Sequence, residues 1–393
     1  MKILGFSCLL ISMLVSPAMA GSAVFFHPDG VGVSGWQALR YATVGPKGNI
    51  NWDRLNNLGV YVGSMQDAAA ATSNGAATTH AYGVQAKTDS YGLIDKKPIK
   101  SASGFAGSIL QEAISKNIKT ILINSGNITE PGTGAFVASV EQRSDFDNIT
   151  EQVLKSGVDI ILSGGEQHML PEGVMGRHGN GKRKDHKNLI TEAQKAGYIV
   201  VYNSEELARA AQQKPQKLLG VFASNHSFND LPELELKQKN LPRYSATAPT
   251  IARMIENSLE IVKGHDFLMI AEEEATDNFA NVGNPDAVIE ALQRADNALG
   301  VILDFKNKNN SDLMLITLSD SDAGGMQVRS EKKGVKTLYN YKNSVGDIVN
   351  FSLVTAGKED YAGGILARST HKLPLLVDNT QIYQLLREQV IND

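Results

Sequence analysis

The stretch FLMIAEEEATDNFAN, residues 267–281, joins a continuous apolar run to a cluster of acids and amides. An unbroken run such as FLMIA is typical of a strand that is buried on both faces, which favours a mainly parallel sheet. The acids follow the run directly, so they belong to the carboxyl end of that strand. Three interpretations are open at this point: a metal site, a charged surface loop, or the remains of a former catalytic site.

Other apolar runs have the same form, and several of them end in Gly, Ser, Asp or Glu. They are SAVFFHPDG (22–30), KTILINSGN (119–127), VDIILSGGE (158–166), YIVVYNS (198–204), KLLGVFASN (217–225) and LMLITLSDSD (313–322). Helical periodicity lies between them, as in 249–262 and in 284–305, where Asn284 caps the helix and Pro285 takes its first position. This alternation predicts an α/β three-layer fold, with a mostly parallel central sheet and helices on both faces. We expect the chemistry at the carboxyl ends of the strands.

Residues 21–393 contain no internal repeat and no low-complexity linker, so we expect a single domain with insertions. The main insertion is a basic loop near 165–190, with the sequence GEQHMLPEGVMGRHGNGKRKDHKN over 165–188. It is rich in Gly, Lys, Arg and His and has no periodicity. Two interpretations stay open: a solvated surface loop, or a basic rim that steers anionic substrates toward a nearby site.

The first twenty residues, MKILGFSCLLISMLVSPAMA, have the anatomy of a secretory signal peptide. Cleavage after Ala20 would give a periplasmic or secreted protein, and Cys8, the only cysteine, would leave with the signal, so the mature chain would form no disulfide. No other stretch approaches the ~20 apolar residues that span a bilayer. The 393-residue chain has a formal net charge of −4, which indicates neither a nucleic acid nor an anionic membrane as partner.

Two segments carry residues suited to phosphate chemistry. In His27-Pro28-Asp29-Gly30 an acid follows an expected strand; it could reach a metal, although Pro-Asp-Gly is also an ordinary turn. The stretch ATSNGAATTHAYGVQAKT, 71–88, predicts a helix that begins near Ser73. A hydroxyl at a helix N-terminus suits attack on phosphate, because backbone N–H groups and the helix dipole favour negative charge there; Ser and Thr are also ordinary helix caps.

Acids at several strand ends on one edge of a sheet would repel one another unless cations were present. The acids concerned are Asp29, Glu272, Asp277, Asp320 and Asp322. Oxygen-only clusters suit hard divalent ions such as magnesium, calcium or manganese. The sequence therefore favours a metal site at this edge.

Taken in order along the chain, these segments resemble the alkaline phosphatase family. HPDGVG resembles its first metal motif, TSNGAATTHAYGVQAKT its nucleophile segment, and TEPGTGAFVASVEQR (129–143) its phosphate-binding segment. The resemblance implies that Asp29 bridges metals, Ser73 is the nucleophile, Arg143 clamps phosphate and Glu130 lies in a magnesium site. Thr72 stands where the family has an aspartate, and it stays an alternative nucleophile.

The departures from the family pattern concern its histidines. The resemblance places Glu272 and Asp277 on acidic ligands, but Asn281 stands where the family has a histidine. Asp320 matches a family aspartate and is followed by Ser321 instead of histidine; Asp322 is an alternative ligand. In EDYAGGILAR (359–368), Asp360 falls on the last family histidine, with His371 as an alternative. Replacement of every zinc-ligand histidine implies an oxygen-rich site that holds another metal.

These features together predict a secreted, metal-dependent alkaline phosphatase that hydrolyses small phosphate monoesters through a phosphoserine intermediate. Two or three divalent ions are expected, with magnesium, calcium or manganese favoured by the oxygen ligands and zinc by the family resemblance. A homodimer stays an open expectation. The alternatives are a phosphodiesterase or sulfatase of the same superfamily, and a non-catalytic periplasmic phosphate-binding or phosphoester-binding protein.

Overall fold

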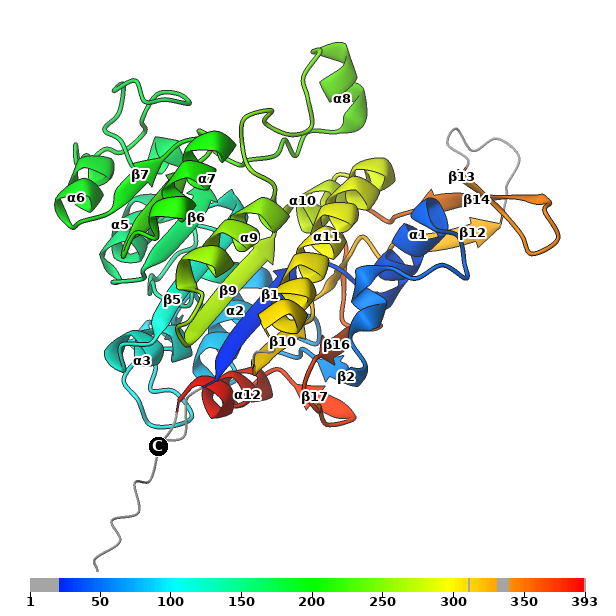
Figure 1. Ribbon diagram of the computed structural model, residues 1–393, viewed down its shortest axis with the longest axis horizontal. Helices are drawn as coiled ribbons and strands as arrows, with labels where there is room; N and C mark the ends of the chain where they lie inside the picture. Colours follow the sequence, from blue (N-terminus) through cyan, green and yellow to red (C-terminus); the bar gives the residue numbers. More distant parts are fainter. Residues whose placement is uncertain (1–20, 310–311, 331–338, 392–393) are drawn as a thin grey trace, which may run out of the picture.

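The computed structural model describes residues 21–309, 312–330 and 339–391 (Figure 1). The expected signal peptide, residues 1–20, lies outside these described residues, so it stays a prediction. Among the described helices, none is both long and apolar enough to cross a membrane.

A ten-stranded sheet forms the centre of the molecule. From β10 to β7 its strands are parallel, whereas β16 pairs antiparallel with both β10 and β2, and β17 is parallel to β2. In the order in which they lie in the sheet, the strands are β17 (Leu376–Asp378), β2 (Asn57–Val62), β16 (Leu366–Ser369), β10 (Leu313–Thr317), β1 (Ser22–Pro28), β9 (Phe267–Glu273), β5 (Lys119–Asn127), β6 (Ile160–Gly164), β8 (Leu218–Val221) and β7 (Ile199–Val201).

Every apolar run identified in the sequence forms a strand of this sheet, and the expected α/β fold is confirmed. The strands that the sequence did not indicate are shorter or less apolar. They are β2, β16 and β17 in the main sheet, the small sheet of β12 (Gln327–Ser330), β14 (Ile348–Val354) and β13 (Tyr339–Lys342), and the short pairs β3 (Leu93–Ile94) with β4 (Lys97–Pro98) and β11 (Asp322–Ala323) with β15 (Asp360–Tyr361).

The central strands are apolar throughout because both faces of the sheet are covered. On β1, Val24 and Phe26 belong to one buried cluster, while Ala23 and Phe25 belong to another, as expected from the alternation of side chains along a strand. Each buried phenylalanine contributes about 1.5–3 kcal/mol relative to exposure. The first face is covered by α1 (Val33–Thr43), α7 (Ser204–Gln213), α9 (Ile251–Val262), α10 (Ala275–Asn281) and α11 (Pro285–Asn309), and the second by α2 (Ser73–Tyr82), α3 (Ile109–Ser115), α5 (Phe146–Lys155), α6 (Leu189–Lys195) and α12 (Gln381–Val390).

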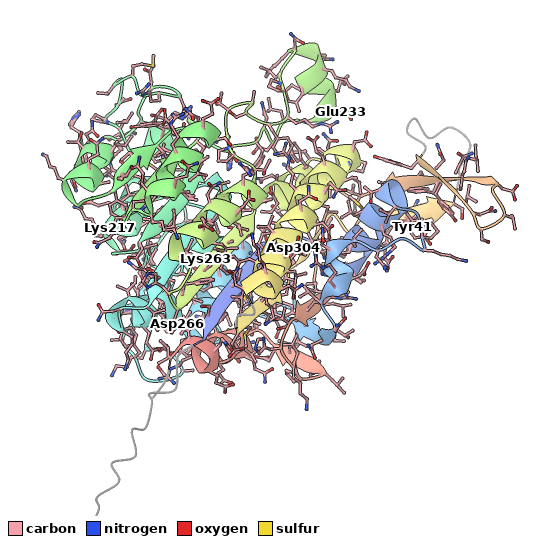
Figure 2. All side chains as sticks on the ribbon, in the orientation of Figure 1. Tyr41, Lys217, Glu233, Lys263, Asp266 and Asp304 are labelled. Carbon is pink, nitrogen blue, oxygen red and sulfur yellow. The ribbon has the colours of Figure 1, made fainter. Side chains whose placement is uncertain are left out.

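The helix expected over 284–305 begins at Asn284, the cap that the sequence indicates, and the helix expected in 249–262 begins after Thr250. The side chain of Thr250 accepts a hydrogen bond from the N–H of Arg253 at the start of α9, and Asn284 accepts one from Ala287 at the start of α11. Figure 2 labels Asp304 on α11 and Lys263 directly after α9, both on the helix layer in front of the sheet. It also labels Asp266, which precedes β9 and therefore marks the amino end of that strand.

The basic loop near 165–190 is held together by its own buried polar groups. The carboxylate of Glu166, in the 3-10 helix η2 (Glu166–His168), accepts hydrogen bonds from the N–H groups of Arg177, His178 and Gly179. The buried guanidinium of Arg183 binds Asp185 at 2.6 Å. Lys182 and Lys184, on either side of Arg183, are exposed. The remaining described helices are α4 (Pro131–Gly134), α8 (Glu233–Gln238) and the 3-10 helix η1 (Asn51–Arg54).

The strand order brings several polar strand ends to one edge of the sheet. Strand β1 lies between β10 and β9, and β9 also pairs with β5, all in parallel. In this register His27 pairs with Glu272 and Pro28 pairs with Glu273. The segments that follow these four strands therefore meet at the carboxyl edge of the sheet, which is where α/β sheets bind ligands.

Candidate functional site

Asp29 lies at the centre of the carboxyl edge, directly after β1. Its side chain is buried, and its backbone is held by β9 and α10, because its N–H donates to Glu273 O at 3.1 Å and its carbonyl accepts from Thr276 Oγ1 at 2.6 Å. The next residue, Gly30, has φ +64°, and a Cβ there would lie 2.7 Å from Asp277 Oδ1. Glycine is therefore required for the chain to turn so close to the acids.

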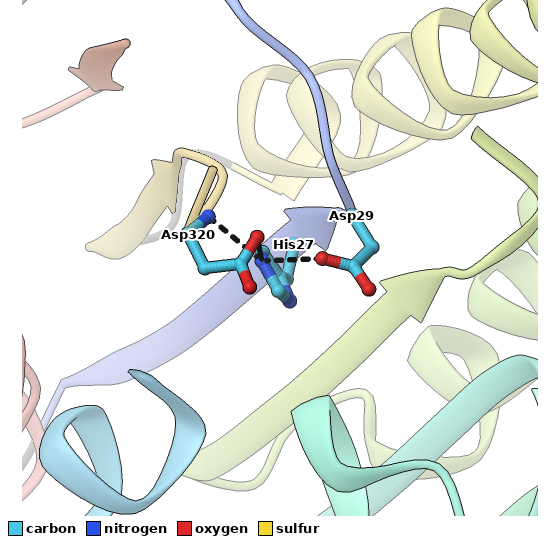
Figure 3. A group of neighbouring side chains, drawn as sticks. All are labelled: His27, Asp29 and Asp320. Carbon is cyan, nitrogen blue, oxygen red and sulfur yellow. Dashed lines mark hydrogen bonds and ion pairs between the residues drawn. The ribbon is translucent and has the colours of Figure 1, made fainter. Parts of the chain in front are cut away.

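Asp29 shares this edge with a histidine from its own strand and an aspartate from the loop after β10. His27 Nε2 lies 3.6 Å from Asp29 Oδ1 and 3.6 Å from Asp320 Oδ1 (Figure 3). The backbone N–H of Asp320 also donates to His27 Nε2, at 3.2 Å. All three side chains are buried, and their ligand-type atoms lie within 4.8 Å of one another.

Asp29 also belongs to a second group of acids, with Glu274 and Asp277. One carboxylate oxygen of each lies within 4.8 Å of the others. Glu274 follows β9, and Asp277 lies in the first turn of α10, where Asn281 Nδ2 donates to Asp277 Oδ2 at 2.7 Å. Two buried oxygens in the cluster, Asp29 Oδ1 and Glu274 Oε2, have no hydrogen-bond partner. Buried carboxylate oxygens normally have partners, so these two atoms fit a site that holds cations.

Burial and mutual repulsion shift the pKa values across this cluster. Burial, followed by the neighbouring acids, raises the pKa of Asp29 and of Glu274 well above the ordinary range and that of Asp277 to about 8. Burial would lower the pKa of His27, but Asp320 and Glu272 raise it to about 10. Burial would likewise raise the pKa of Asp320, but His27 lowers it below its usual value. The site thus concentrates negative charge that protons or cations must balance.

Ser73 and Thr72 occupy different positions at the start of α2. Ser73 is the first residue of the helix, and its Oγ lies 3.4 Å from Asp29 Oδ2. Thr72 is the N-cap, and its Oγ1 accepts from the N–H of Gly75 at 3.3 Å and donates to Thr88 O at 2.5 Å. The hydroxyl of Thr72 is therefore committed to the cap, whereas that of Ser73 faces the acid cluster.

Arg143 and Glu130 form an ion pair beside the cluster. Arg143 Nη2 lies 3.2 Å from Glu130 Oε2, and the Arg143 side chain is half-exposed. Burial would lower the pKa of Arg143, but Glu130, Glu274 and Asp29 raise it, so the guanidinium stays charged. Glu130 Oε1 also lies 3.8 Å from His226 Nδ1. A cleft of about 540 Å³ opens here, lined by Glu130, Phe146, His168, Lys182, Lys184 and His226 among others.

Glu272 lies behind His27, and both of its carboxylate oxygens are engaged. Its Oε1 lies 3.1 Å from His27 Nδ1, and its Oε2 accepts from Asn124 Nδ2 at 2.5 Å. Gly132 presses against it, because a Cβ at that residue would lie 1.7 Å from Glu272 Oε1. Glu273 is occupied as well, since its Oε1 accepts from Ser125 Oγ at 2.8 Å. Each carboxylate oxygen of Glu272 therefore has a protein partner in this structure, whereas its predicted role as a metal ligand stays a prediction.

The remaining candidates lie at different distances from the cluster. The carboxylate of Asp322 accepts a hydrogen bond from the N–H of Gly32 at 3.2 Å. Asp360, on β15, is exposed, but its negative charge contributes to the raised pKa of Asp277. Neither belongs to the two groups described above. His371 Nε2 lies 3.1 Å from Asp312 Oδ1. Asp312 precedes β10, so His371 lies at the opposite end of that strand from Asp320 and is excluded from the site.

A family model described as alkaline phosphatase matches residues 21–360. The chain belongs to the alkaline phosphatase family. The repressible alkaline phosphatase of Saccharomyces cerevisiae is 25% identical over 231 residues, which cover 56% of this chain and 40% of that protein. The alkaline phosphatase of Escherichia coli K12 is 22% identical over 323 residues, which cover 71% of this chain and 66% of that protein. The chain spans about half the length of the first relatives that it matches.

Solved structures of alkaline phosphatases share the fold over nearly the whole chain. The enzyme from the Antarctic bacterium TAB5 superposes with a TM-score of 0.74 at 17% identity, covering 95% of this chain and 99% of that chain. The enzyme from Thermus thermophilus also gives a TM-score of 0.74 at 17% identity, covering 95% of this chain and 92% of that chain. The family is metal-dependent, and the acid and histidine groups at the carboxyl edge could bind metal.

Two residues of this edge were not identified from the sequence as site residues. The sequence indicates an oxygen-rich site, and the structure also places the imidazole of His27 among the carboxylates. His27 precedes Asp29 by two positions, and side chains two positions apart along an extended chain point to the same face, so the sequence contains a signal for His27. The spacing of the family motif indicates Glu272 and Asp277 and gives no role to Glu274, but the turn between β9 and α10 brings Glu274 beside Asp29.

Proposed function

We propose that the protein is an exported, metal-dependent phosphatase that hydrolyses phosphate monoesters of small molecules through a phosphoserine at Ser73. The observation that carries this proposal is the position of Ser73 Oγ, 3.4 Å from Asp29 Oδ2 at the start of α2. Family membership supports a phosphatase, and the monoester preference and the nucleophile are our inference.

The proposed reaction proceeds in two displacements at phosphorus. Ser73 Oγ loses its proton and forms a bond to phosphorus, while the bond to the alcohol oxygen breaks and that oxygen takes up a proton. Water then attacks the phosphoserine, which releases inorganic phosphate and restores the serine hydroxyl. The backbone N–H groups at the start of α2 would favour the negative charge on the phosphoryl oxygens.

The donor set at the carboxyl edge fits divalent cations. Asp29, Asp320, Glu274 and Asp277 supply carboxylates, and two of their buried oxygens have no partner. Divalent ions bound there would favour the ionised serine and offset the negative charge that develops on the phosphoryl oxygens. Five further residues stay predicted metal ligands of lower rank, since the geometry groups none of them with Asp29: Glu130, Glu272, Asn281, Asp322 and Asp360.

Arg143 is the proposed phosphate clamp. Its planar guanidinium can donate two parallel hydrogen bonds to phosphoryl oxygens, which a lysine cannot do. Glu130 pairs with this guanidinium and also lines the cleft, so the alcohol portion of the substrate would lie among Phe146, His168 and the two exposed lysines Lys182 and Lys184. The two lysines support the basic-rim interpretation of the loop near 165–190.

The experiment that tests the proposal compares ester classes after metal restoration. The purified mature chain is stripped with a chelator, and zinc, magnesium, calcium and manganese are added back separately and in pairs. A phosphate monoester, a phosphate diester and a sulfate ester are then assayed, and the monoester is expected to turn over fastest. Faster turnover of the diester or sulfate ester would assign the alternative chemistry, and tight phosphate binding without turnover in every metal would overturn the enzyme assignment.

Export and assembly stay part of the proposal. The signal peptide over 1–20 predicts delivery to the periplasm or the medium, which N-terminal sequencing of the exported protein would check at Gly21. A homodimer, which the sequence leaves open, would be read from the molar mass of the purified chain by light scattering.

A further inference from the structure

The cleft lined by Glu130 contains side chains that the proposed displacements at phosphorus do not use. Its volume of about 540 Å³ lies in the usual range of small-molecule sites. Glu130 pairs with Arg143, the proposed phosphate clamp, so a molecule that fills the cleft would have one end near that clamp. The unused side chains are two aromatic rings and three amides: Phe146, His168, Asn127, Gln167 and Asn225.

A backbone hydrogen bond fixes the orientation of the amides. The N–H of Thr129 donates to Asn127 Oδ1 at 3.1 Å, and a backbone N–H can only donate, so the contacting atom of Asn127 must be its oxygen. Asn127 Nδ2 then donates to Asn225 Oδ1 at 2.6 Å, and Gln167 Nε2 donates to the same oxygen at 2.7 Å. Asn225 Nδ2 takes part in neither bond, and Asn225 is an exposed residue of the cleft wall. It therefore offers a donor to a ligand in the cleft.

The amide of Gln167 keeps its acceptor. Its Nε2 also lies 3.1 Å from His168 Nε2. Burial, followed by the charge of Lys182, lowers the pKa of His168 to about 4, so at neutral pH the ring is uncharged and its Nε2 can accept. Both hydrogens of Gln167 Nε2 are thus donated, and Gln167 Oε1 is in neither bond. The backbone of Gln167 is held on both sides, since its N–H donates to Ser224 O and its carbonyl accepts from the N–H of Lys182.

Phe146 provides an aromatic surface in the same cleft. It is the first residue of α5, and it is 42% exposed, although phenylalanine is usually buried. Its ring centroid lies 4.8 Å from that of His168, with 39° between the ring planes. An exposed aromatic ring that is held in place by a second ring suits the stacking of a planar ligand.

We propose that this cleft is a subsite for a nucleobase and that the preferred substrates are nucleoside monophosphates. The inference rests on the proposed phosphatase function and adds the class of alcohol that the substrate carries. A nucleobase is planar and has a hydrogen-bond acceptor next to a donor on its edge. The acceptor would bind Asn225 Nδ2 and the donor Gln167 Oε1, while the ring stacks on Phe146. Because every common base has such an edge, the subsite selects for a nucleobase but not for one particular base.

Free nucleosides test the subsite without any phosphate chemistry. The wild-type mature chain is titrated by calorimetry with adenosine and with purine riboside, which keeps the ring system but lacks the amino donor. Adenosine should bind, and purine riboside should bind about 10-fold more weakly, because Gln167 Oε1 would lose its donor. Absence of adenosine binding, or equal binding of the two nucleosides, would overturn the inference.

Two variants test whether the nucleoside binds in this cleft. Asn225→Asp keeps the oxygen that accepts from Asn127 and Gln167 but replaces the donor by an acceptor, so the Kd of adenosine should rise by about 10-fold or more. Phe146→Leu keeps an apolar side chain but removes the stacking surface, so the same Kd should rise by about 5- to 100-fold. Adenosine binding that is unchanged in both variants would overturn the inference.

Asn297→Asp is the matched control for Asn225→Asp. Asn297 is an exposed residue of α11, and its Oδ1 also accepts from a glutamine amide, that of Gln293 at 3.2 Å. This variant should bind adenosine as wild type does. A loss equal to that of Asn225→Asp would show an effect of added charge alone and would contradict the proposed donor.

Turnover provides a second reading. The kcat/KM of the wild-type enzyme for adenosine monophosphate should exceed that for ribose monophosphate by about 10-fold or more, and Asn225→Asp should remove most of this difference. A chain that binds adenosine as described but hydrolyses no ester would refute the proposed function and leave the nucleobase subsite standing. A chain that hydrolyses both esters equally well and binds no adenosine would refute the subsite and leave the proposed function standing.

Discussion

Asp29 Oδ2 lies 3.4 Å from Ser73 Oγ, while the other oxygen of the same carboxylate faces His27 Nε2 at 3.6 Å. One side chain therefore connects the proposed nucleophile with the buried imidazole of His27. Each prediction below tests one part of this arrangement.

Removal of the Ser73 hydroxyl should abolish turnover. Ser73→Ala is expected to reduce kcat for p-nitrophenyl phosphate by at least about 10³-fold, because no other hydroxyl at the start of α2 faces Asp29. Thr72→Ala is the matched control; it should retain most of the activity and lose about 1 kcal/mol of stability, because Thr72 caps the helix. Activity that survives in Ser73→Ala but not in Thr72→Ala would assign the nucleophile to Thr72.

Arg143 should be replaceable by lysine only in part. Arg143→Lys keeps the charge but loses the two-pronged geometry, so KM for the ester and the inhibition constant of inorganic phosphate should both rise by about 10-fold or more. Steady-state kinetics and phosphate inhibition measure these quantities. Arg253→Lys, on the solvent side of α9, should behave as wild type. Unchanged phosphate inhibition in Arg143→Lys would remove Arg143 from the binding site.

Metal removal should destabilise the wild-type protein, because burial and the surrounding acids oppose ionisation of Asp29. A cation at about 100 times its Kd would stabilise the folded state by about 2.7 kcal/mol, so adding zinc and magnesium should raise Tm by several degrees. In chelator at pH 9, Asp29→Asn should have a higher Tm than wild type, and added metal should raise the Tm of this variant only slightly. Scanning calorimetry checks both, and an equal metal response in the two proteins would contradict the shared role of Asp29.

The two acids after β10 should differ in their effect on metal-dependent activity. Asp320→Asn should lose activity that added metal does not restore at concentrations sufficient for wild type, because Asp320 Oδ1 faces His27. Asp322→Asn should recover with metal, since the Asp322 carboxylate accepts from the N–H of Gly32. Metal titrations of activity measure the difference, and the opposite ranking would place Asp322 in the site.

Removal of Lys182 and Lys184 should lower kcat/KM more for esters with a negatively charged alcohol portion than for esters with an uncharged one. The double variant Lys182→Ala/Lys184→Ala should lower kcat/KM for monoesters whose alcohol carries a further negative charge, with little effect on p-nitrophenyl phosphate. The difference should shrink as salt rises. Lys237→Ala/Lys239→Ala, on and after α8, is the matched control. A uniform loss for all esters would argue against electrostatic steering.

His168 should make the protein sensitive to acid. Burial, followed by the charge of Lys182, lowers the pKa of His168 to about 4 from 6.5. Between these values the unfolded chain binds a proton that the folded protein does not, so the free energy of unfolding falls as the pH decreases through this window. His168→Gln should lose less stability than wild type from pH 6.5 to pH 4, and His265→Gln, at an exposed position, should match wild type in urea denaturation.

The fold was predictable because each central strand is apolar enough to be recognised alone. The order of the strand ends also indicated Asp29, Asp277 and Asp320 as neighbours, which the structure brings to one edge. The direction of β16 was not predictable, since a short strand with mixed polarity does not reveal whether it runs parallel. That direction places His371 beside Asp312, away from the site.

The directions of the side chains explain why the other residues of the site could not be predicted from the sequence. Family spacing pointed to Glu272, but at the end of β9 this residue points toward His27 and Asn124, while Glu274 reaches Asp29 from the turn into α10. Spacing along the chain does not say which of three consecutive acids faces a neighbouring strand. Only the pairing of β1 with β9 determines it, and that pairing is a tertiary feature.

The pairing of β1 with β9 has a consequence for how active members of such a family are recognised. A rule that requires a histidine directly after Asp320 would classify this chain as inactive, because Ser321 stands there. A rule that requires an imidazole within reach of Asp29 and Asp320 would retain it, because His27 meets that condition from another strand. In this chain the imidazole within reach of Asp29 and Asp320 therefore comes from the neighbouring strand β1 and not from the loop after β10.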